Sequence, residues 1–402
     1  MLSLESARQQ ILARLAPLPT ESIPVSQGYG RFLAQNITAS IDLPPFDNSA
    51  MDGYAVRSAD VAGATGESSI PLQLAGRSAA GDSATSSVDR GACLQVFTGA
   101  PLPPGADAVV MQEDTRVDTG DPRCIWICDA VKPWENVRFK GEDVKRGSLV
   151  LLAGDRMTAA RLGLVSALGV GAIQVGRRPR IALLSTGTEL SEAGKKLEPG
   201  RIYESNRIML APLLERSGAI VRILPLVPDT LGATREALTN AFEDCDAVVS
   251  SGGVSVGELD FVKAAFEGLG GKLDLWRIAV KPGKPFAFGT LDGKHLFGLP
   301  GNPVSALVTF ILLVRPSLHR WQGAMHTDPA QRRVVAGEVF ENRAERRHFM
   351  RVRLDESGQA RLAGSQASHV LGSLAGADGL LDVPPSTTIS PGEPAMFIGF
   401  DD

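Results

Sequence analysis

The sequence predicts a multidomain protein of the α/β plus β class, and three observations support this prediction. The chain has 402 residues, which is more than one ordinary domain holds. Between residues 179 and 325, short apolar segments alternate with amphipathic ones, as strands and helices do in an α/β domain. The regions on either side are rich in turn-forming residues and in short period-two patterns, which indicate smaller, β-rich domains.

The beginning of the chain predicts a helical domain. Apolar residues recur at helical spacing over residues 4–15, and we expect a second helix over residues 28–37. A further helical stretch follows at residues 158–170, and we expect it to pack back on the N-terminal helix. The predicted helical domain is therefore discontinuous and comprises residues 1–43 and 141–178.

Residues 44–140 then form an insertion into that helical domain. They are rich in Gly, Pro, Ser and Asp, and they contain short apolar runs such as CLQVFTG and DAVVMQE. Short apolar runs between frequent turn residues are typical of small β domains. We therefore predict a β-rich insertion domain.

Residues 179–325 predict a three-layer α/β domain with a parallel sheet. We expect strands at residues 180–186, 219–227, 246–251, 272–280, 285–291 and 295–300. We expect helices at residues 204–218, 229–244, 258–270 and 302–321, the last capped by Asn302 with Pro303 in its first turn. Strands that are apolar along their whole length are buried on both faces, which is typical of a parallel sheet between two helical layers.

Residues 326–402 predict a small C-terminal β-barrel. Period-two stretches occur at residues 333–340 and 348–354, and Pro and Gly separate them. Four domains are thus expected along the chain.

Composition excludes several classes of protein. The formal net charge is −4, so no basic surface for nucleic acid is expected. No apolar run approaches the roughly 20 residues of a membrane span, and the first residues lack the pattern of a signal peptide. The four cysteines form no CxxC pair, so free thiols are favoured over a zinc site or disulfides. These features predict a cytoplasmic protein that binds neither membrane nor nucleic acid.

Polar loops follow the predicted strands of the α/β domain. In an open parallel sheet, ligands bind outside the carboxyl ends of the strands. The loops that leave these ends are TGTEL at 186–190, the turn at Asp229, GGVSVGELD at 252–260, KPGKP at 281–285 and PGNPVSA at 300–306. One such loop is usually only a turn, but several on one rim indicate a binding site.

The residues of these loops suit an anionic ligand. Gly252 and Gly253 lack Cβ atoms, so their backbone N–H groups can approach phosphate oxygens, and Ser255 and Thr186 add hydroxyl donors. Lys281 and Lys284 lie on either side of a tight Pro-Gly turn, where two cations can hold an oxyanion.

Carboxylates on the same rim suggest a metal ion. Glu189, Asp229 and Asp260 follow three different strands. Carboxylates beside phosphate are understandable if Mg²⁺ lies between them, since Mg²⁺ prefers oxygen ligands and bridges phosphate oxygens. For Asp229 alone, the competing interpretation is a helix cap, because this residue directly precedes a predicted helix.

The insertion carries polar turns of its own. The segment PPFDNSAMDGYAV at residues 44–56 contains Asp52, and Thr98 and Asp143 lie in two further turns. The simplest interpretation of the first segment is two consecutive turns. Spacing alone assigns none of these residues a role.

Seven motifs, in order and spacing, resemble the molybdopterin molybdenumtransferases, a family that includes the bacterial MoeA proteins and the E domain of gephyrin. They are PPFDNSAMDGYAV, FTGAPLPPGADAVVMQE, RFKGEDV, LSTGTEL, SSGGVSVGELD, IAVKPGKPFAFG and GLPGNPVSA. The resemblance covers nearly the whole chain.

This resemblance implies an enzyme and a reaction. Molybdenum from molybdate would be inserted into adenylylated molybdopterin with the help of Mg²⁺, and AMP would leave. It implies an elongated homodimer whose site lies between the α/β domain of one subunit and the insertion of the other. Transient contacts with the molybdopterin adenylyltransferase and with apo-molybdoenzymes would supply the substrate and receive the product.

The resemblance also implies roles for individual residues. Catalytic roles fall to Glu189, Asp229 and Asp260, which would also hold the metal, and to Asp52, Thr98 and Asp143 from the insertion. Molybdate would be bound by Lys281, Lys284, Arg351 and Ser373, with Ser368 as an alternative to Ser373. Molybdopterin and its phosphate would be bound by Thr186, Gly187, Gly252, Gly253, Ser255, Pro300, Gly301 and Asn302.

Two other functions stay open at this point. The molybdopterin adenylyltransferase shares the α/β domain and would consume ATP, but the insertion motifs argue against it. A scaffold or carrier would bind molybdopterin without turnover, although a scaffold does not need three carboxylates beside two lysines. The sequence does not separate molybdate from tungstate.

Overall fold

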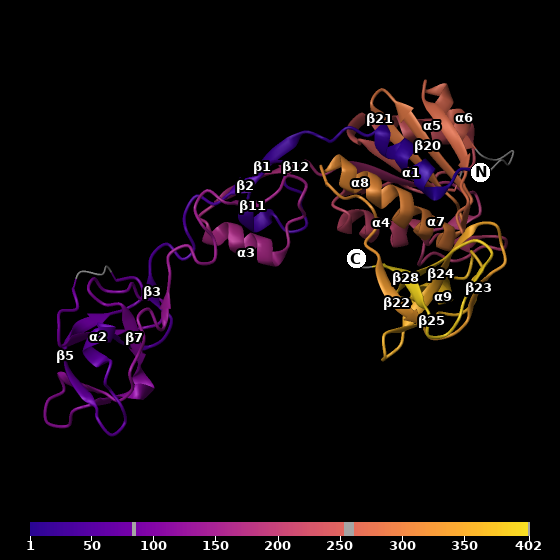
Figure 1. The fold of residues 1–402 in the computed structure, drawn as a ribbon. Coiled ribbons are helices and arrows are strands. Elements are labelled where there is room, and N and C mark those ends of the chain that lie inside the picture. The colour runs from indigo at the N-terminus through magenta and orange to yellow at the C-terminus, as the bar shows by residue number, and fades with distance from the viewer. Residues whose placement is uncertain (83–85, 253–260, 401–402) are drawn as a thin grey trace. The chain divides into compact units, whose positions relative to one another are not determined.

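The computed structural model describes residues 1–82, 86–252 and 261–400. The chain divides into two compact units. Unit 1 comprises Met1–Gln35, Ala153–Thr158 and Ala172–Asp402, and unit 2 comprises Asn36–Leu152 and Ala159–Gly171. Figure 1 shows the elements of both units. No helix in the described parts of the chain is long and apolar enough to cross a membrane.

The centre of unit 1 is a six-stranded sheet in the order β16-β13-β17-β21-β20-β18. Its strands are β13 (Arg180–Ser185), β16 (Ile220–Ile223), β17 (Ala247–Ser251), β18 (Lys272–Arg277), β20 (Pro285–Leu291) and β21 (Lys294–Leu299). The first four strands in the order run parallel, whereas β20 is antiparallel to both of its neighbours.

The predicted parallel sheet is therefore a mixed sheet. The physical reason lies in the turn between β20 and β21. Asp292 and Gly293 have φ angles of 47° and 78°, and Leu291 pairs with Lys294 across them. A two-residue turn with positive φ at both positions makes a hairpin, which leaves no room for a helical crossover.

Helices cover both faces of this sheet, as predicted. The helices are α4 (Asn206–Arg216), α5 (Leu231–Asp244), α6 (Phe261–Gly268), α7 (Pro303–Thr309), the π-helical turn η3 (Phe310–Val314) and α8 (Arg315–Trp321). Ile181 and Leu183 belong to the same core as α4, α7 and α8, whereas Ala182 and Leu184 belong to the core under α5 and α6. This alternation along one strand gives three layers.

The N-terminal helix α1 (Leu4–Ala13) belongs to unit 1, where it packs against α8 and η3. Its buried residues Leu4, Ala7 and Ile11 join the core of the α/β domain. The helix α3 (Ala159–Ala167), which we expected to pack on it, belongs to unit 2. The four domain boundaries drawn from the sequence stay predictions.

The second predicted N-terminal helix, over residues 28–37, does not form. Gly30 has a φ of 76°, and the segment makes isolated bridges at Phe32 and Leu33 instead. The backbone N–H groups of Gly30 and Leu33 donate to carbonyls of residues 155–157, so long-range pairing satisfies groups that a helix would pair locally. Nearby, β1 (Thr20–Pro24), which leads into the turn η1 (Val25–Gln27), pairs with β12 (Ala172–Gly176).

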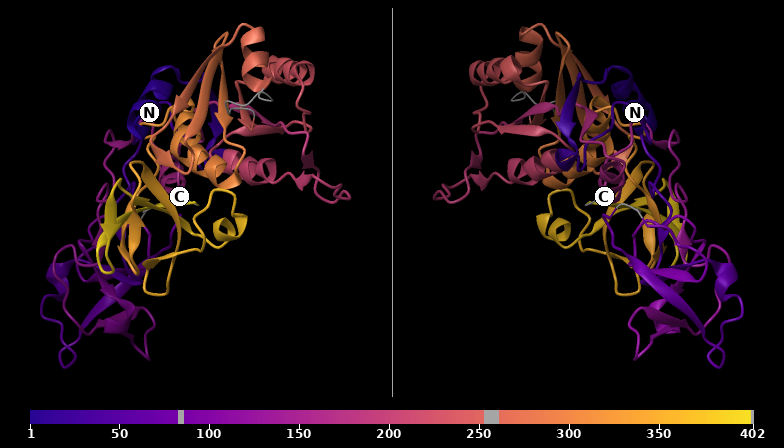
Figure 2. Two further views of the ribbon diagram at one scale, coloured as in Figure 1. Left: turned by 90° about the vertical axis from the view of Figure 1, so that its right-hand side faces the viewer. Right: turned by 90° about the vertical axis from the view of Figure 1, so that its left-hand side faces the viewer.

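The C-terminal part of unit 1 is the predicted small β-barrel. Strands β24 (Arg347–Leu354), β25 (Gln359–Leu362), β22 (Arg332–Ala336), β28 (Pro394–Gly399) and β26 (Gly379–Val383) pair in this order. An additional β24–β26 pairing closes the ring, drawn in orange and yellow in Figure 2. The remaining elements here are β19 (Val280–Lys281), which pairs with β24, the two-stranded β23 (Phe340–Asn342) and β27 (Thr387–Ile389), and α9 (Leu371–Ala375).

Unit 2 contains the predicted β-rich insertion. Its main sheet has the order β7-β4-β6-β5-β9-β8. These strands are β4 (Gly53–Val56), β5 (Ile70–Ser78), β6 (Ala92–Val96), β7 (Ala108–Met111), β8 (Thr115–Val117) and β9 (Cys124–Ile127). Smaller elements are α2 (Ser58–Val61), η2 (Gln112–Asp114), the pair β3 (Asn48–Ser49) and β10 (Val137–Arg138), and the pair β2 (Ile37–Thr38) and β11 (Leu149–Leu151).

Candidate functional site

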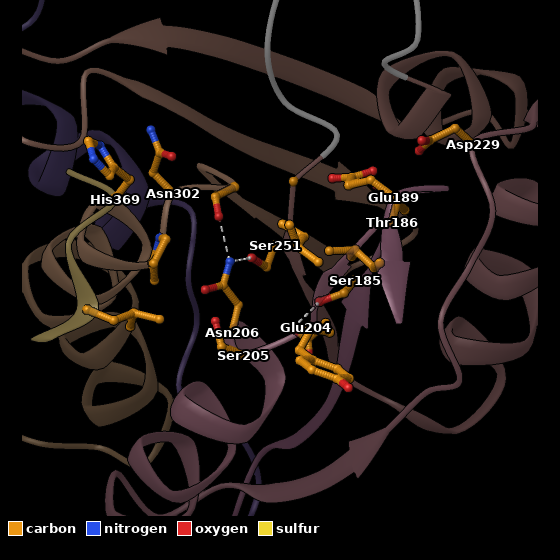
Figure 3. A pocket seen from close by; sticks show the side chains of 18 residues that line it. Ser185, Thr186, Glu189, Glu204, Ser205, Asn206, Asp229, Ser251, Asn302 and His369 are labelled. Carbon is orange, nitrogen blue, oxygen red and sulfur yellow. Dashed lines mark hydrogen bonds between the residues drawn. The ribbon is translucent and has the colours of Figure 1, made fainter. Parts of the chain in front are cut away.

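A cavity of about 680 Å³ lies in unit 1 at the carboxyl ends of the parallel strands. This volume is in the usual range for a small-molecule site. Its described lining residues are Ser185, Thr186, Gly187, Glu189, Leu190, Ile202, Tyr203, Glu204, Ser205, Asn206, Asp229, Ser251, Gly252, Gly301, Asn302, Pro303, His369 and Leu371. Figure 3 shows Glu189 and Asp229 at one end of the cavity and Asn302 and His369 at the other.

Although the sheet is mixed, the loops that were predicted to form one rim still lie at the same edge of it. Because β18 is antiparallel to β20, and β20 is antiparallel to β21, β18 runs in the same direction as β21. The loops after β13, β16, β17, β18 and β21 therefore all leave the same edge of the sheet.

The structure brings seven of the predicted residues together in the cavity wall: Thr186, Gly187, Glu189, Asp229, Gly252, Gly301 and Asn302. Pro300 is buried beside this wall and does not line it. Gly253, Ser255 and Asp260 lie outside the described residues.

Glycine is needed at two positions of this wall. A Cβ atom on Gly187 would lie 2.7 Å from Oε2 of Glu189 and 2.8 Å from Cγ of Leu190, so a side chain there would displace the carboxylate. Gly252 has a φ of 86°, and its Cβ would lie 3.2 Å from the carbonyl oxygen of Thr186. These contacts let the loops after β13 and β17 approach each other closely.

Asp229 is held by the loop after β13 and does not cap α5. The backbone N–H of Thr188 donates to Oδ2 of Asp229 at 2.8 Å, and the backbone N–H of Asp229 donates to Oγ1 of Thr188 at 3.2 Å. The cap of α5 is Thr230, whose hydroxyl accepts the N–H of Ala233 at 3.3 Å. The competing interpretation of Asp229 as a helix cap is therefore wrong.

Two carboxylates at one end of the cavity suit a divalent cation. Glu189 and Asp229 line the same end, and Thr186, from the loop that carries Glu189, lies beside Glu189 in the same wall. This set of oxygen donors is the kind that Mg²⁺ prefers. Among the described residues, no group of three His, Cys, Asp or Glu side chains gathers as a metal cage.

A buried ion pair that the sequence did not predict includes Glu204 of the cavity wall. Glu204 and Arg207 are only 5% and 4% exposed. Glu204 accepts hydrogen bonds from the Ser185 hydroxyl at 3.2 Å and from the backbone N–H and Nε of Arg207 at 2.8 and 3.2 Å. Arg207 also donates to Glu192 at 2.9 Å and to the carbonyl of Leu224. The pair thus ties α4 to the ends of β13 and β16.

Asn206 was also missed, and it joins three loops. Its Nδ2 donates to the Ser251 hydroxyl at 2.6 Å and to the carbonyl of Gly301 at 2.7 Å (Figure 3). The sequence contained a signal, because Ser205 and Asn206 are polar residues at the start of a helix that follows a strand of the sheet, and ligands bind at that edge of such sheets. The helical pattern had placed both residues inside that helix.

A loop of the β-barrel completes the cavity. Nδ2 of Asn302 donates to the hydroxyl of Ser368 at 3.2 Å, and the backbone N–H of Val304 donates to the carbonyl of Ser368 at 3.3 Å. These bonds bring His369 and Leu371 to the cavity wall. His369 was not among the predicted residues, since nothing in its local sequence indicates a contact with the distant β21–α7 loop.

Arg351 holds this barrel loop in place. Its side chain is 0% exposed, and its Nε donates to the Ser373 hydroxyl at 3.0 Å. Its Nη2 donates to the carbonyls of Ser365 and Ala367 at 2.5 and 3.1 Å, and its Nη1 has no partner among the described residues. Burial lowers the pKa of this guanidinium. The predicted pair Arg351 and Ser373 is thus brought together, whereas Ser368 lies on the cavity side.

The two predicted lysines are not among the described residues that line the cavity. Lys281 is half-buried in β19, opposite His348 of β24, and Lys284 is exposed after the Pro-Gly turn. Burial, followed by the charges of Lys281, Arg351 and Arg346, lowers the pKa of His348 to about 4. The β19–β24 junction is therefore a region of positive charge.

In unit 2, two of the predicted residues form one hydrogen-bonded pair. The backbone N–H and the hydroxyl of Thr98 donate to Oδ1 of Asp52 at 2.7 and 2.8 Å. These bonds lower the pKa of Asp52 and so favour its charged form. Asp143 is exposed, and its backbone N–H donates to the carbonyl of Leu43.

Three family models match consecutive parts of the chain. Residues 2–169 match the MoeA N-terminal region (domains I and II), residues 182–320 match a probable molybdopterin binding domain, and residues 333–400 match the MoeA C-terminal region (domain IV). The chain is also 40% identical over 376 residues to the molybdopterin molybdenumtransferase of Haemophilus influenzae, a match that covers 92% of this chain and 91% of that protein. The chain belongs to the MoeA family.

Other MoeA relatives agree with this assignment. The molybdopterin molybdenumtransferase 2 of Mycobacterium tuberculosis is 36% identical over 390 residues, with 96% of each chain covered. The crystal structure of the molybdopterin biosynthesis MoeA protein from Pyrococcus horikoshii OT3 matches with a TM-score of 0.84 and 29% identity over 99% of this chain and 100% of that one. The predicted family and the predicted multidomain fold are thus confirmed.

Proposed function

We propose that this MoeA protein inserts molybdenum from molybdate into adenylylated molybdopterin, releasing AMP, during molybdenum cofactor biosynthesis. Relatives at 36–40% identity carry the name molybdopterin molybdenumtransferase. The observation that carries the proposal is the cavity itself, which has two carboxylates at one end and amide and imidazole groups at the other. A ligand with a phosphoanhydride and an extended heterocyclic part suits both ends.

The acidic end would receive the phosphoanhydride together with Mg²⁺. Glu189 and Asp229 would hold the metal, with Asp260 as the third carboxylate predicted from the sequence. When bound, Mg²⁺ would neutralise phosphate charge and polarise phosphorus. Thr186 would bind phosphate oxygens through its hydroxyl, and Gly187, which has no side chain, would let them approach the loop. An oxygen from molybdate or water would attack a phosphorus of the anhydride, the bond from phosphorus to the bridging oxygen would break, and AMP would leave.

The rest of the cavity would orient the substrate. Asn206 fixes the positions of Ser251 and Gly301, and the Glu204–Arg207 pair fixes the start of α4. These bonds hold the wall before the ligand arrives, and preorganisation of this kind is what positioning requires. Asn302 and His369 would donate hydrogen bonds at the end away from the metal.

Molybdate would bind near the β19–β24 junction, where Lys281, Lys284 and Arg351 supply positive charge and Ser373 a hydroxyl. Molybdate is a tetrahedral dianion, so cations and hydroxyls are the groups that should receive it. The positive surroundings of His348 support this placement.

We further propose a cytoplasmic homodimer in which Asp52, Thr98 and Asp143 of one subunit complete the site of the other. The lowered pKa of Asp52 supports a charged carboxylate at the insertion side. The adenylyltransferase of the pathway would deliver the substrate, and apo-molybdoenzymes would receive the product.

The test is AMP release from adenylylated molybdopterin with Mg²⁺ and molybdate. We expect release by the parent protein, its loss when EDTA removes the metal, and a marked decrease in Lys281→Ala. The matched control is Lys263→Ala, which removes an exposed lysine whose ion pair with Glu267 spans 3.9 Å, and it should keep full activity. Binding without release would indicate a carrier or scaffold, and pyrophosphate release from ATP would indicate an adenylyltransferase.

A further inference from the structure

Two aromatic side chains are exposed together in unit 2. Trp134 and Phe139 are 48% and 43% exposed, and their ring centroids lie 5.5 Å apart with an interplanar angle of 53°. The other three tryptophans, Trp126, Trp276 and Trp321, are half-buried or buried. A tryptophan usually buries most of its ring area, so an exposed aromatic pair requires an explanation.

The backbone of Trp134 adds a second, independent observation. Trp134 has a φ of 67°, in the left-handed region that disfavours bulky side chains. The surroundings impose this conformation, because the backbone N–H of Trp134 donates to the backbone carbonyl of Asp107. The backbone N–H of Val109 donates in turn to the backbone carbonyl of Glu135. Glycine or asparagine would adopt this backbone with less strain. The backbone conformation at this position therefore gives no reason for a tryptophan, and the contact with Phe139 leaves about half of its surface exposed.

The aromatic pair lies beside the insertion residues that were predicted for the site. Strand β10 pairs with β3, and the backbone N–H of Ala50 donates to the carbonyl of Asn136. Asp52 follows Ala50 by two residues, and Asp143 follows Phe139 by four. In the sequence, the pair thus lies between Thr98, which contacts Asp52, and Asp143.

We propose that Trp134 and Phe139 form an aromatic platform that stacks a planar nitrogen heterocycle of the substrate. The proposal rests on the proposed function, because adenylylated molybdopterin carries two such heterocycles, the pterin and the adenine. Rings of this kind stack on tryptophan whatever their substituents. The exposed Arg138 and Lys140 flank Phe139 in the chain and add positive charge near the platform, and Lys140 also pairs with Asp42 at 3.6 Å.

The decisive variants are Trp134→Gly and Trp134→Asn, because both residues tolerate a positive φ. We expect each variant to unfold within about 4 °C of the parent, since removal of backbone strain offsets the lost ring contact. The KM for adenylylated molybdopterin should rise roughly 10-fold or more, as expected for the loss of one stacking ring, with kcat nearly unchanged. Trp134→Phe should retain most of the affinity. The matched control is Tyr29→Ala, which removes an aromatic side chain that is 72% exposed in unit 1, and it should change neither value.

Two binding measurements identify the heterocycle and do not depend on turnover. AMP and 6-hydroxymethylpterin would each be titrated calorimetrically into the parent and the Trp134→Asn variant. Weaker binding of AMP alone would assign the platform to adenine, and weaker binding of the pterin alone would assign it to the pterin. If the variant is folded and binds both probes as the parent does, the platform is refuted, even if the parent releases AMP. A large loss of stability in both Trp134 variants would also refute the proposal, because the ring would then serve the fold.

Discussion

Arg207→Met is the substitution whose effect follows most directly from the structure. Arg207 is 4% exposed and bridges Glu204 on one side and Glu192 on the other, at 3.2 and 2.9 Å. Methionine can fill the space of the arginine stem, so packing is largely kept. The substitution leaves the buried carboxylate of Glu204 without its cation, although the Ser185 hydroxyl and a backbone N–H still donate to it.

The expected cost follows from this burial. Removal of one partner from a buried ion pair destabilises by about 3–5 kcal/mol, because the other charge stays buried and uncompensated. For a unit of this size, we expect the melting temperature of unit 1 to fall by about 6–20 °C. Glu204→Gln should cost less, because glutamine still accepts hydrogen bonds and Arg207 keeps Glu192. The double variant should lose less than the sum of the two single variants.

The assay is differential scanning calorimetry at neutral pH, with AMP release measured at about 20 °C, near the usual temperature of maximum stability, on the fraction that is folded. The matched control is Arg222→Met, which breaks an ion pair of 2.7 Å with Asp244 in the same domain, where both side chains are about half exposed. An exposed pair contributes about 0–1 kcal/mol, so the control should melt like the parent. If Arg207→Met melts within about 2 °C of the parent, which corresponds to about 0.5–1 kcal/mol, the pair does not fix the cavity wall and the reasoning fails.

Three further predictions test other parts of the molecule. Burial lowers the pKa of His295 to about 4, below the ordinary value of 6.5, so the unfolded chain binds a proton first as the pH falls. The free energy of unfolding should therefore decrease as the pH falls from 6.5 to about 4. His295→Phe can keep the stacking on Phe288, whose ring centroid lies 5.4 Å from that of His295, and it should make this decrease smaller in a pH series of thermal melts. Thr98→Val removes the hydroxyl hydrogen bond that helps to lower the pKa of Asp52. NMR titration should therefore show the pKa of Asp52 rising toward its ordinary value. An unchanged pKa would mean that the Thr98 hydroxyl does not stabilise the carboxylate. Ser373→Ala should raise the KM for molybdate, because Ser373 contacts Arg351. Ser368→Ala should raise the KM for adenylylated molybdopterin, because Ser368 contacts Asn302. The reverse result would exchange the roles of the two serines.

Much of the fold followed from the sequence because its signals are local. The strands β13, β17 and β21 are apolar along their length, and the helices between them have one apolar face, so the three layers could be predicted. The hairpin between β20 and β21 had a local signal too, the pair Asp292-Gly293, which favours a two-residue turn. The apolar pattern of the strands favours a fully parallel sheet and does not by itself show this turn.

The failures came from pairing between distant residues. Residues 28–37 have a helical pattern, but the N–H groups of Gly30 and Leu33 bond to residues 155–157, which no local signal reveals. Asp229 lies on the rim as predicted, but the contact with Thr188 that holds it there joins residues 41 positions apart and has no local signal. Asn206 begins a helix, as the pattern predicted, but the pattern does not show that its side chain meets Ser251 and Gly301.

The same limit applies to the barrel loop, where the structure adds most to the candidate site. Arg351 is fully buried, yet its described partners are a hydroxyl and backbone carbonyls, none of which carries a charge. A buried guanidinium with neutral partners keeps its positive charge only at a cost in free energy. Burial lowers the pKa of Arg351 for this reason. Its Nη1 is also left without a partner in the described part of the chain. An arrangement of this kind costs stability in the free protein, and an anion bound nearby would reduce that cost. This supports the proposal that Arg351, which orders the loop beside Asn302, also attracts molybdate.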